Sequence, residues 1–444
     1  MTRADPFLPS PWTALAKNWS RPIDKWRRLM ARFQRRRPSA TAPREPFSAL
    51  LRSSGNLADL RPHLLVLVPW LPIGGAEVLL ADILDSLKAE WRLSIVTTET
   101  GDHALAPAFA AITSEIYHLP DLLDRRHWLE FIITLMASRG SSAILSSGSR
   151  FLYKNLKRIK ARFPAILSYD ILHNDAPRAH LASALRARRH IDRLIAVNER
   201  IGRALTRGGA GPGTVAVIPN GVDYEGVFNP QGVDIGAARE RFGIGDGIFV
   251  IGFVGRMSEE KRPLSFLAVA APILAAHPNV RLLVLGDGPM TKTFHHAASA
   301  AGIADRLHHL PGLDRAAMPQ FYAACDILLL SSRIEGAPLA MLEALAMGCP
   351  VAATDVGDAA LVIREGINGF IVPVAVPEAL TPRIAKLVGD EAALERMRSA
   401  ARRAVIDNGR SADAMLAAYR ALIRPIREIQ GDVEASGNCD RRAL

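Results

Sequence analysis

The stretch CDILLLSSRIEGAPLAMLEALAMGCP, from Cys325 to Pro350, decides the fold. Its apolar run predicts a buried strand over residues 327–330, followed by a short polar loop. The next residues favour a helix that opens at Pro338 and closes at Gly348. Proline suits a first helical turn, and glycine suits the position just past the last turn.

Two glutamates in this stretch are candidates for ligand binding. Glu335 lies in the loop at the mouth of the predicted helix, and Glu343 lies one and a half turns inside it. A helix N-terminus attracts phosphate, because its backbone N–H groups are unpaired and its dipole is positive there. The first acid can then bind hydroxyls that the phosphate carries, and the second can bind another polyol, such as a ribose. The spacing alone is common, and by itself it favours ordinary solvent-facing acids.

The flanking residues EGAPLAMLEALAMG closely resemble the signature of the glycosyltransferase family 4 type, the retaining sugar-nucleotide-dependent enzymes with the GT-B fold. The resemblance covers residues 64–423 and is stronger in the second half. It implies an α/β protein of two doubly wound Rossmann-like domains with a cleft between them. The implied reaction moves a hexose from a nucleotide-diphosphate sugar to a hydroxyl of a glycan or lipid-linked acceptor, in surface polysaccharide synthesis. It further implies that Glu335 binds the sugar hydroxyls and Glu343 the ribose, and that the diphosphate meets the backbone of Gly336, Ala337, Pro338 and Leu339.

The rest of the chain alternates predicted strands with helical patterns, which implies parallel sheets covered on both faces. Two such series predict an N-terminal acceptor-binding domain over residues 59–217 and a C-terminal nucleotide-sugar domain over residues 218–428. A basic arm (1–58) would precede them and a disordered tail (429–444) would follow. The expected strands are 64–68, 93–97, 143–146, 165–169, 194–197 and 215–218 in the first series, and 249–254, 281–285, 307–310, 327–330, 351–353 and 369–372 in the second; residues 76–89 and 411–423 show helical patterns.

Ligands of doubly wound sheets bind at the carboxyl ends of the strands. Arg256 and Lys261 follow the predicted strand 249–254, where two cations can neutralise a diphosphate. An arbitrary Arg/Lys pair is more often two surface charges. The sequence VGRMSEEKRP, however, resembles the Arg…Lys pair of the family, which implies the phosphate role.

Three residues of the first half also follow predicted strands. Gly74 and Gly75 precede a helix, where glycine lets a backbone approach a ligand closely, although glycines alone equally fit a plain strand–helix turn. The GGAE sequence is similar to the family loop that faces the donor phosphates and the acceptor. His173 is expected on a polar loop, at a place similar to that of a family histidine that contacts the transferred sugar. A lone histidine is otherwise usually structural.

Further candidates come from the second half. Asn220 lies in PNGVD, which resembles the interdomain turn of the family. Gly286 and Gly288 lie in GDGPM, which the family places near the nucleotide, although a bare strand exit would also use glycine. Leu313 lies in PGLD, where family members hold the base largely through backbone groups.

Composition limits the alternatives. The 444 residues are 49% hydrophobic and 22% charged, as in an ordinary globular protein, and no uncharged apolar run reaches the length that spans a bilayer. The first residues lack the apolar core of a signal peptide, and three cysteines favour a reducing cytoplasm. Asp-x-Asp, G-x-G-x-x-G, a P-loop and metal-ligand spacing are all absent, so we expect neither a metal nor a cofactor.

Most of the net charge of +11 belongs to the N-terminal arm, because residues 1–60 hold twelve basic and four acidic residues. Within residues 12–37, aromatics recur every seven residues, and a predicted helix places an apolar face between arginines. This pattern predicts an interfacial helix on an anionic membrane and a cytoplasmic protein at the inner face of that membrane. Docking of the aromatics on the protein's own body, and a loose basic tail, are the competing interpretations.

Two other functions stay open from the sequence. A sugar-nucleotide epimerase or a phosphorylase can use the same scaffold. A non-enzymatic protein that binds nucleic acid through its basic arm is the second alternative. Because the body is nearly neutral and the arm is short, we do not expect a nucleic-acid partner.

Overall fold

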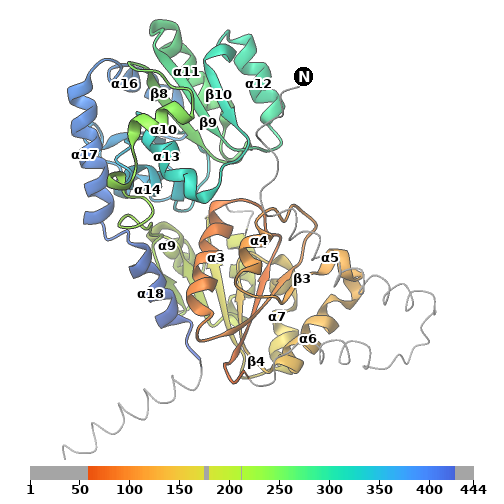
Figure 1. The fold of residues 1–444 in the computed structure, drawn as a ribbon. Helices are drawn as coiled ribbons and strands as arrows, with labels where there is room; N and C mark the ends of the chain where they lie inside the picture. Colours follow the sequence, from red (N-terminus) through yellow and green to blue (C-terminus); the bar gives the residue numbers. More distant parts are fainter. Residues whose placement is uncertain (1–58, 175–179, 212, 426–444) are drawn as a thin grey trace, which may run out of the picture.

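The computed structural model describes residues 59–174, 180–211 and 213–425, and the interpretations given above for the arm (1–58) and the tail (429–444) lie outside them. Within the described residues, the strands form a seven-stranded and a six-stranded sheet, each in its own lobe (Figure 1). The first sheet has the order β3-β2-β1-β4-β5-β6-β7 and the second β10-β9-β8-β11-β12-β13. Every strand pair in both sheets is parallel. The predicted fold of two doubly wound units is confirmed.

The strands of the first unit are β1 (His63–Val68), β2 (Arg92–Thr97), β3 (Ile116–His118), β4 (Ser141–Ser146), β5 (Leu167–Leu172), β6 (Arg193–Ala196) and β7 (Val215–Val217). Its helices are α3 (Gly75–Leu87), α4 (Ala106–Ala110), α5 (Leu119–Leu122), α6 (Trp128–Arg139), α7 (Arg150–Arg162), α8 (His180–Ala187) and α9 (Glu199–Arg207). The central strand β1 is buried along its whole length, as expected of a strand covered on both faces.

The strands of the second unit are β8 (Phe249–Val254), β9 (Val280–Leu285), β10 (Leu307–Leu310), β11 (Ile327–Leu330), β12 (Val351–Thr354) and β13 (Gly369–Val372). Its helices are α10 (Ile235–Arg241), α11 (Pro263–Ala276), α12 (Thr291–Ala300), α13 (Met318–Ala324), α14 (Leu339–Ala346), α15 (Ala359–Val362), α16 (Thr381–Ala385) and α17 (Glu391–Asp407). The chain ends its described part with α18 (Ala412–Leu422).

Two expectations differ from the structure in the first sheet. The short edge strand β3 was not predicted, because three half-buried residues give little periodicity. The strand expected at 165–169 is β5, three residues further on. Asp170, a polar residue that breaks the apolar run, lies inside this strand and is buried, where it accepts hydrogen bonds from the Tyr153 hydroxyl at 2.9 and 3.0 Å. Burial raises the pKa of Asp170 to about 7.

The last helix returns to the first unit, although the sequence placed residues 411–423 in the second. Helix α18 packs against α3, and Met415, Tyr419 and Ile423 belong to the apolar core of the first unit. The Trp91 indole N–H donates to the carbonyl of Ile423 at 3.0 Å. Figure 1 shows α17 along the upper lobe and α18 along the lower one, so the chain crosses between the lobes a second time.

Candidate active site

The loops that follow β8 and β11 bring two predicted site residues into contact. These strands are neighbours in the second sheet, so their carboxyl ends lie side by side. Lys261 donates a hydrogen bond from Nζ to Oε1 of Glu335, and the Ser332 hydroxyl donates to the same oxygen at 2.7 Å. The Glu335 side chain is 10% exposed and that of Lys261 is 29% exposed. A carboxylate and an ammonium are therefore in contact at the mouth of α14, where the sequence had placed Glu335 alone.

Arg256 is exposed and lies near the first unit. It interacts electrostatically with Glu77 of α3, whose pKa burial raises to about 6. The Glu77 carboxylate lies over Gly74, because a Cβ at Gly74 would stand 2.5 Å from Oε2. Glu77 is thus a half-buried carboxyl near the candidate phosphate site.

Glycine is required where the first unit meets the entrance of α14. A Cβ at Gly336 would overlap the backbone carbonyl of His173. The Asn198 side-chain amide donates to the Gly336 carbonyl at 2.6 Å, and the Asn220 amide donates to the Ala337 carbonyl at 2.9 Å. Side chains from outside the second sheet therefore fix the loop that presents Glu335.

The glycine pair of the first unit, Gly74 and Gly75, also lies close to the N-terminus of α14. Gly75 begins α3 and faces the Leu339 side chain, since a Cβ at Gly75 would stand 3.7 Å from Leu339 Cδ1. Pro338 caps the N-terminus of α14 with an extended backbone (φ −66°, ψ 111°), so the helix begins one residue later than predicted. Two helix N-termini from different units thus point into one site.

His173 lies directly after β5, at the start of the segment that follows this strand. Its Nε2 lies 2.9 Å from the Ser147 hydroxyl, which follows β4. Burial, with a smaller effect of the nearby His180, lowers the pKa of His173 to about 4. The imidazole is therefore neutral at pH 7 and can bind a hydroxyl without adding charge.

Glu343 already has a partner that the sequence did not reveal. The Tyr322 hydroxyl of α13 donates to Oε2 of Glu343 at 2.6 Å. Burial raises the pKa of Glu343, and Arg315 opposes this effect. Arg315 also forms a two-pronged ion pair with Asp82 of α3, at 2.9 and 2.7 Å. Glu343 is thus an enclosed carboxyl beside a contact between the units.

The glycines of GDGPM pack the loop after β9 onto the loop after β8. Gly286 has φ +133°, and a Cβ there would overlap the Gly255 carbonyl; Gly288 has φ +158°, and its Cβ would stand 2.6 Å from the Met257 carbonyl. The Gly286 carbonyl lies 2.7 Å from Nε2 of His309. Leu313, in the next loop of this edge, packs partly buried against the core of the second unit.

Within the described residues, no group of three His, Cys, Asp or Glu side chains is arranged to hold a metal ion. Cys325 and Cys349 are buried free thiols, and burial raises the pKa of both. In the same part of the chain, no helix is both long and apolar enough to cross a bilayer.

Comparison with known proteins identifies similar sequences and similar folds. Residues 234–404, which lie in the second unit, match the family model described as "Glycosyl transferases group 1". The whole fold resembles Alr3699/HepE from Anabaena, solved with UDP-glucose, with a TM-score of 0.68 at 20% identity over 81% of this chain and 99% of that one. It also resembles sucrose-phosphate synthase from Thermosynechococcus elongatus, with a TM-score of 0.67 at 18% identity over 84% and 100%. These likenesses confirm the GT-B fold.

The curated relatives are glycosyltransferases. The D-inositol 3-phosphate glycosyltransferase of Segniliparus rotundus is 35% identical over 236 residues, which are 50% of this chain and 51% of that protein. The enzyme of the same name from Nocardiopsis dassonvillei is 28% identical over 344 residues, 73% of this chain and 76% of that protein. The chain thus spans about half the length of the first of these relatives.

Proposed function

We propose that the protein is a retaining glycosyltransferase of the family 4 type, which moves a hexose from a nucleotide-diphosphate sugar to a hydroxyl of a glycan or lipid-linked acceptor. The observation that carries this proposal is the Lys261–Glu335 pair at the N-terminus of α14, with Arg256 facing the same cleft. The cation suits the diphosphate of the donor, and the carboxylate beside it suits the hydroxyls of the sugar. The solved complex of Alr3699/HepE with UDP-glucose supports the class of donor.

The proposed chemistry needs charge stabilisation more than a protein nucleophile. The acceptor oxygen bonds to the anomeric carbon as the bond to the diphosphate oxygen breaks, and both electrons of that bond go to the diphosphate. The acceptor proton passes to a departing phosphate oxygen on the same face of the sugar. Arg256 and Lys261 would stabilise the negative charge that develops there. Glu335 and neutral His173 would bind hydroxyls of the transferred sugar.

The decisive experiment incubates the protein with a panel of radiolabelled nucleotide-diphosphate sugars and candidate acceptors, and separates transfer from hydrolysis. We expect release of the nucleotide diphosphate with retained anomeric configuration in the product. We also expect activity to persist in excess chelator, since cationic side chains take the place of a metal at the diphosphate. Activity that stops in chelator and returns with magnesium or manganese would contradict this design.

The alternatives predict different products. An epimerase would convert the donor without an acceptor, and a phosphorylase would require inorganic phosphate in place of a nucleotide. The same assay therefore decides among the three. A role in surface polysaccharide synthesis is part of our proposal and would be tested by identifying the acceptor that supports turnover.

Glu343 gives a test of the nucleotide half of the site. We expect Glu343→Gln to weaken binding of the free nucleotide diphosphate by about tenfold, because a buried carboxylate acceptor for the ribose is lost. Tyr322→Phe is the matched control: it keeps the carboxylate and removes only its present partner. Calorimetry on both variants separates the two effects. Unchanged affinity in Glu343→Gln would show that the ribose lies elsewhere.

Membrane association through residues 12–37 stays a proposal from the sequence pattern, because these residues lie outside the described part of the chain. A chain that starts at Leu57 should lose binding to anionic vesicles and keep transfer to water-soluble acceptors. Full-length protein should bind such vesicles in a salt-sensitive manner. If full-length protein ignores the vesicles at low salt, the membrane role is wrong.

A further inference from the structure

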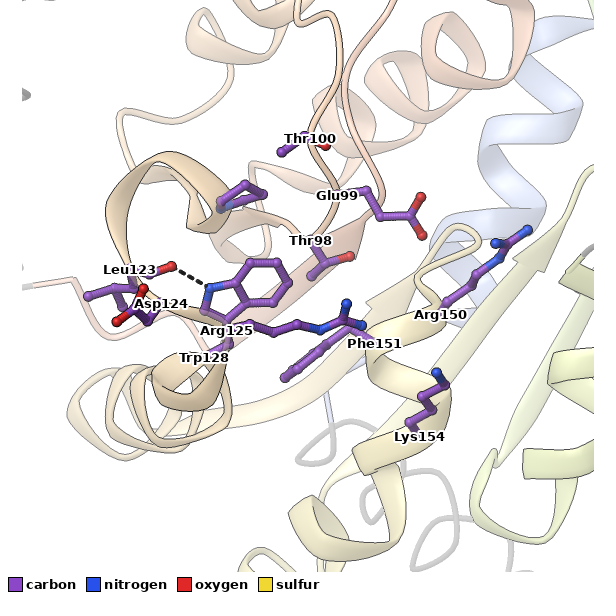
Figure 2. A pocket seen from close by; sticks show the side chains of 11 residues that line it. Thr98, Glu99, Thr100, Leu123, Asp124, Arg125, Trp128, Arg150, Phe151 and Lys154 are labelled. Carbon is purple, nitrogen blue, oxygen red and sulfur yellow. Dashed lines mark hydrogen bonds between the residues drawn. The ribbon is translucent and has the colours of Figure 1, made fainter.

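A second concave site, which the proposed donor chemistry does not use, opens at the carboxyl edge of the first sheet (Figure 2). The pocket has a volume of about 600 Å³. Its lining comes from residues 98–100 after β2, residues 120–128 after β3 and the first turns of α7 after β4. The carboxyl ends of three strands therefore meet around one hollow, which is where doubly wound units bind ligands.

The neutral walls of the pocket are firmly positioned. Trp128 and Phe151 are buried and pack edge to face, with ring centroids 5.4 Å apart. The Trp128 indole N–H donates a hydrogen bond to the Leu123 carbonyl at 2.9 Å, as Figure 2 shows. The Thr98 hydroxyl lies 2.9 Å from the Ser149 hydroxyl, which in turn caps the N-terminus of α7. These groups shape the pocket, but their hydrogen-bonding atoms already have partners within the protein.

Unlike the neutral walls, the basic side chains of the pocket are free to bind a ligand. Arg125 lies with its guanidinium carbon 5.6 Å from the centre of the Trp128 ring, and Figure 2 shows it extending toward the face of α7 that carries Arg150 and Lys154. All three cations are exposed. In the part of the chain that the structure describes, none of them forms an ion pair. The pocket thus holds three cations that have no ion-pair partner among the described residues.

The acidic residues of the pocket do not cancel this charge. Asp124 already pairs with Arg126 at 3.2 Å, outside the lining. Glu99 is then the one other carboxylate among the lining residues. The basic surface also continues, because Arg150 and Lys154 line a neighbouring pocket of about 500 Å³ together with Arg186 and His190. A ligand with concentrated negative charge fits this surface better than a neutral sugar.

The pocket is connected to the candidate active site through a few residues. Ser149, which contacts Thr98 of the pocket, lies two residues after Ser147, which contacts His173. The carbonyl of His173 in turn lies against Gly336 at the entrance of α14. Because β2, β4 and β5 end at the same edge of the sheet, a molecule anchored in the pocket can extend toward the cleft.

We propose that this pocket binds the phosphate group of the acceptor, through Arg125, Arg150 and Lys154. Calling the ligand the acceptor rests on the proposed glycosyltransferase function; the phosphate chemistry rests on the pocket itself. The aromatic wall would pack against the carbon skeleton next to the phosphate. The phosphate can belong to a water-soluble phosphate ester or to a lipid headgroup, and the two sources share this recognition.

The test measures binding to the full-length protein by calorimetry with two monomeric probes, glycerol 1-phosphate and dihexanoyl phosphatidic acid below its micelle concentration. The double variant Arg150→Gln/Lys154→Gln should weaken binding at least about tenfold, because charge-assisted hydrogen bonds to phosphate are lost. The matched control is Lys157→Gln/Arg158→Gln, which removes the same charge from exposed positions of α7 outside both pockets. Nucleotide diphosphate affinity should stay unchanged in both.

The outcomes separate the two proposals. Loss in the pocket variant alone supports the inference, and the probe that binds more tightly identifies a soluble or a lipid source. Equal loss in both double variants would mean diffuse attraction by the basic surface and would overturn it, as would absence of binding to either probe. If phosphate binding follows the pocket but no donor is turned over, the pocket stands and the proposed function fails. The reverse result is also distinguishable. If wild-type protein binds neither probe, and Arg150→Gln/Lys154→Gln transfers the sugar at the full rate to acceptors without phosphate, then the proposed function stands and the pocket inference fails.

Discussion

Lys261→Ala and Arg256→Ala are each expected to lower kcat by about 10²–10³, the usual loss when one preorganised group that faces developing charge is removed. Lys261 is the sharper of the two tests, because it already contacts Glu335 from the neighbouring loop. Removing its ammonium takes away a cation for the leaving diphosphate and also leaves the Glu335 carboxylate without its charged partner. The measurement is steady-state transfer with saturating donor and acceptor.

Two controls separate catalysis from folding. Lys261→Arg keeps the positive charge and should recover part of the rate, whereas Lys386→Ala removes an exposed cation of the same unit and should leave kcat unchanged. Thermal unfolding of the alanine variants should stay close to that of wild type, because Arg256 is exposed and Lys261 is 29% exposed. Turnover near that of wild type in both alanine variants would exclude the proposed diphosphate role.

The second unit was predictable because its signals are local. The apolar runs at 249–254, 327–330 and 369–372 match β8, β11 and β13 at both ends. Buried parallel strands read as continuous apolar runs, so their limits coincide with the first polar or glycine residues. Arg256, Lys261 and Glu335 were proposed as site residues because they lie in the loops after two of these strands, within stretches that resemble the family's motifs.

The parts that the sequence did not reveal depend on contacts between distant residues. Tyr322 meets Glu343 and Arg315 meets Asp82 only after the sheets have formed and the units have docked. Nothing in the local pattern of an alternating α/β chain says which surface helix will face which. The return of α18 to the first unit is of this kind, because it depends on contacts of Met415, Tyr419 and Ile423 with residues far away in the sequence.

Buried polar residues explain the errors within the first unit. Asp170 interrupts the apolar run of β5, yet it is tolerated there because Tyr153 donates to it and burial favours its protonated form. The strand therefore continues three residues beyond the predicted end. His173 therefore follows the strand directly and is half-buried there, and burial lowers its pKa to about 4.

The close approach of the two units at Gly336 leads to the other large expected effect. Gly336→Ala should lower kcat by about 10² or more, because the new methyl group would overlap the His173 carbonyl and displace the loop that presents Glu335. A displacement of about 1 Å at a reacting group costs about this much. The Asn198 hydrogen bond to the Gly336 carbonyl, at 2.6 Å, ties the loop to the first unit, so the loop cannot move without loss of that contact.

The control for this change is Gly245→Ala, where a Cβ meets no atom within 4 Å. It should leave both kcat and thermal unfolding near those of wild type. Nucleotide diphosphate affinity separates a local effect from a global one: Gly336→Ala should keep most of it, because Glu343 and the loops after β9 and β10 belong to the second unit alone. A variant that turns over at the wild-type rate with unchanged affinity would show that catalysis does not need His173 and the entrance of α14 in contact. Joint loss of turnover and nucleotide affinity, with a lowered melting temperature, would instead show that Gly336 mainly maintains the fold of the second unit.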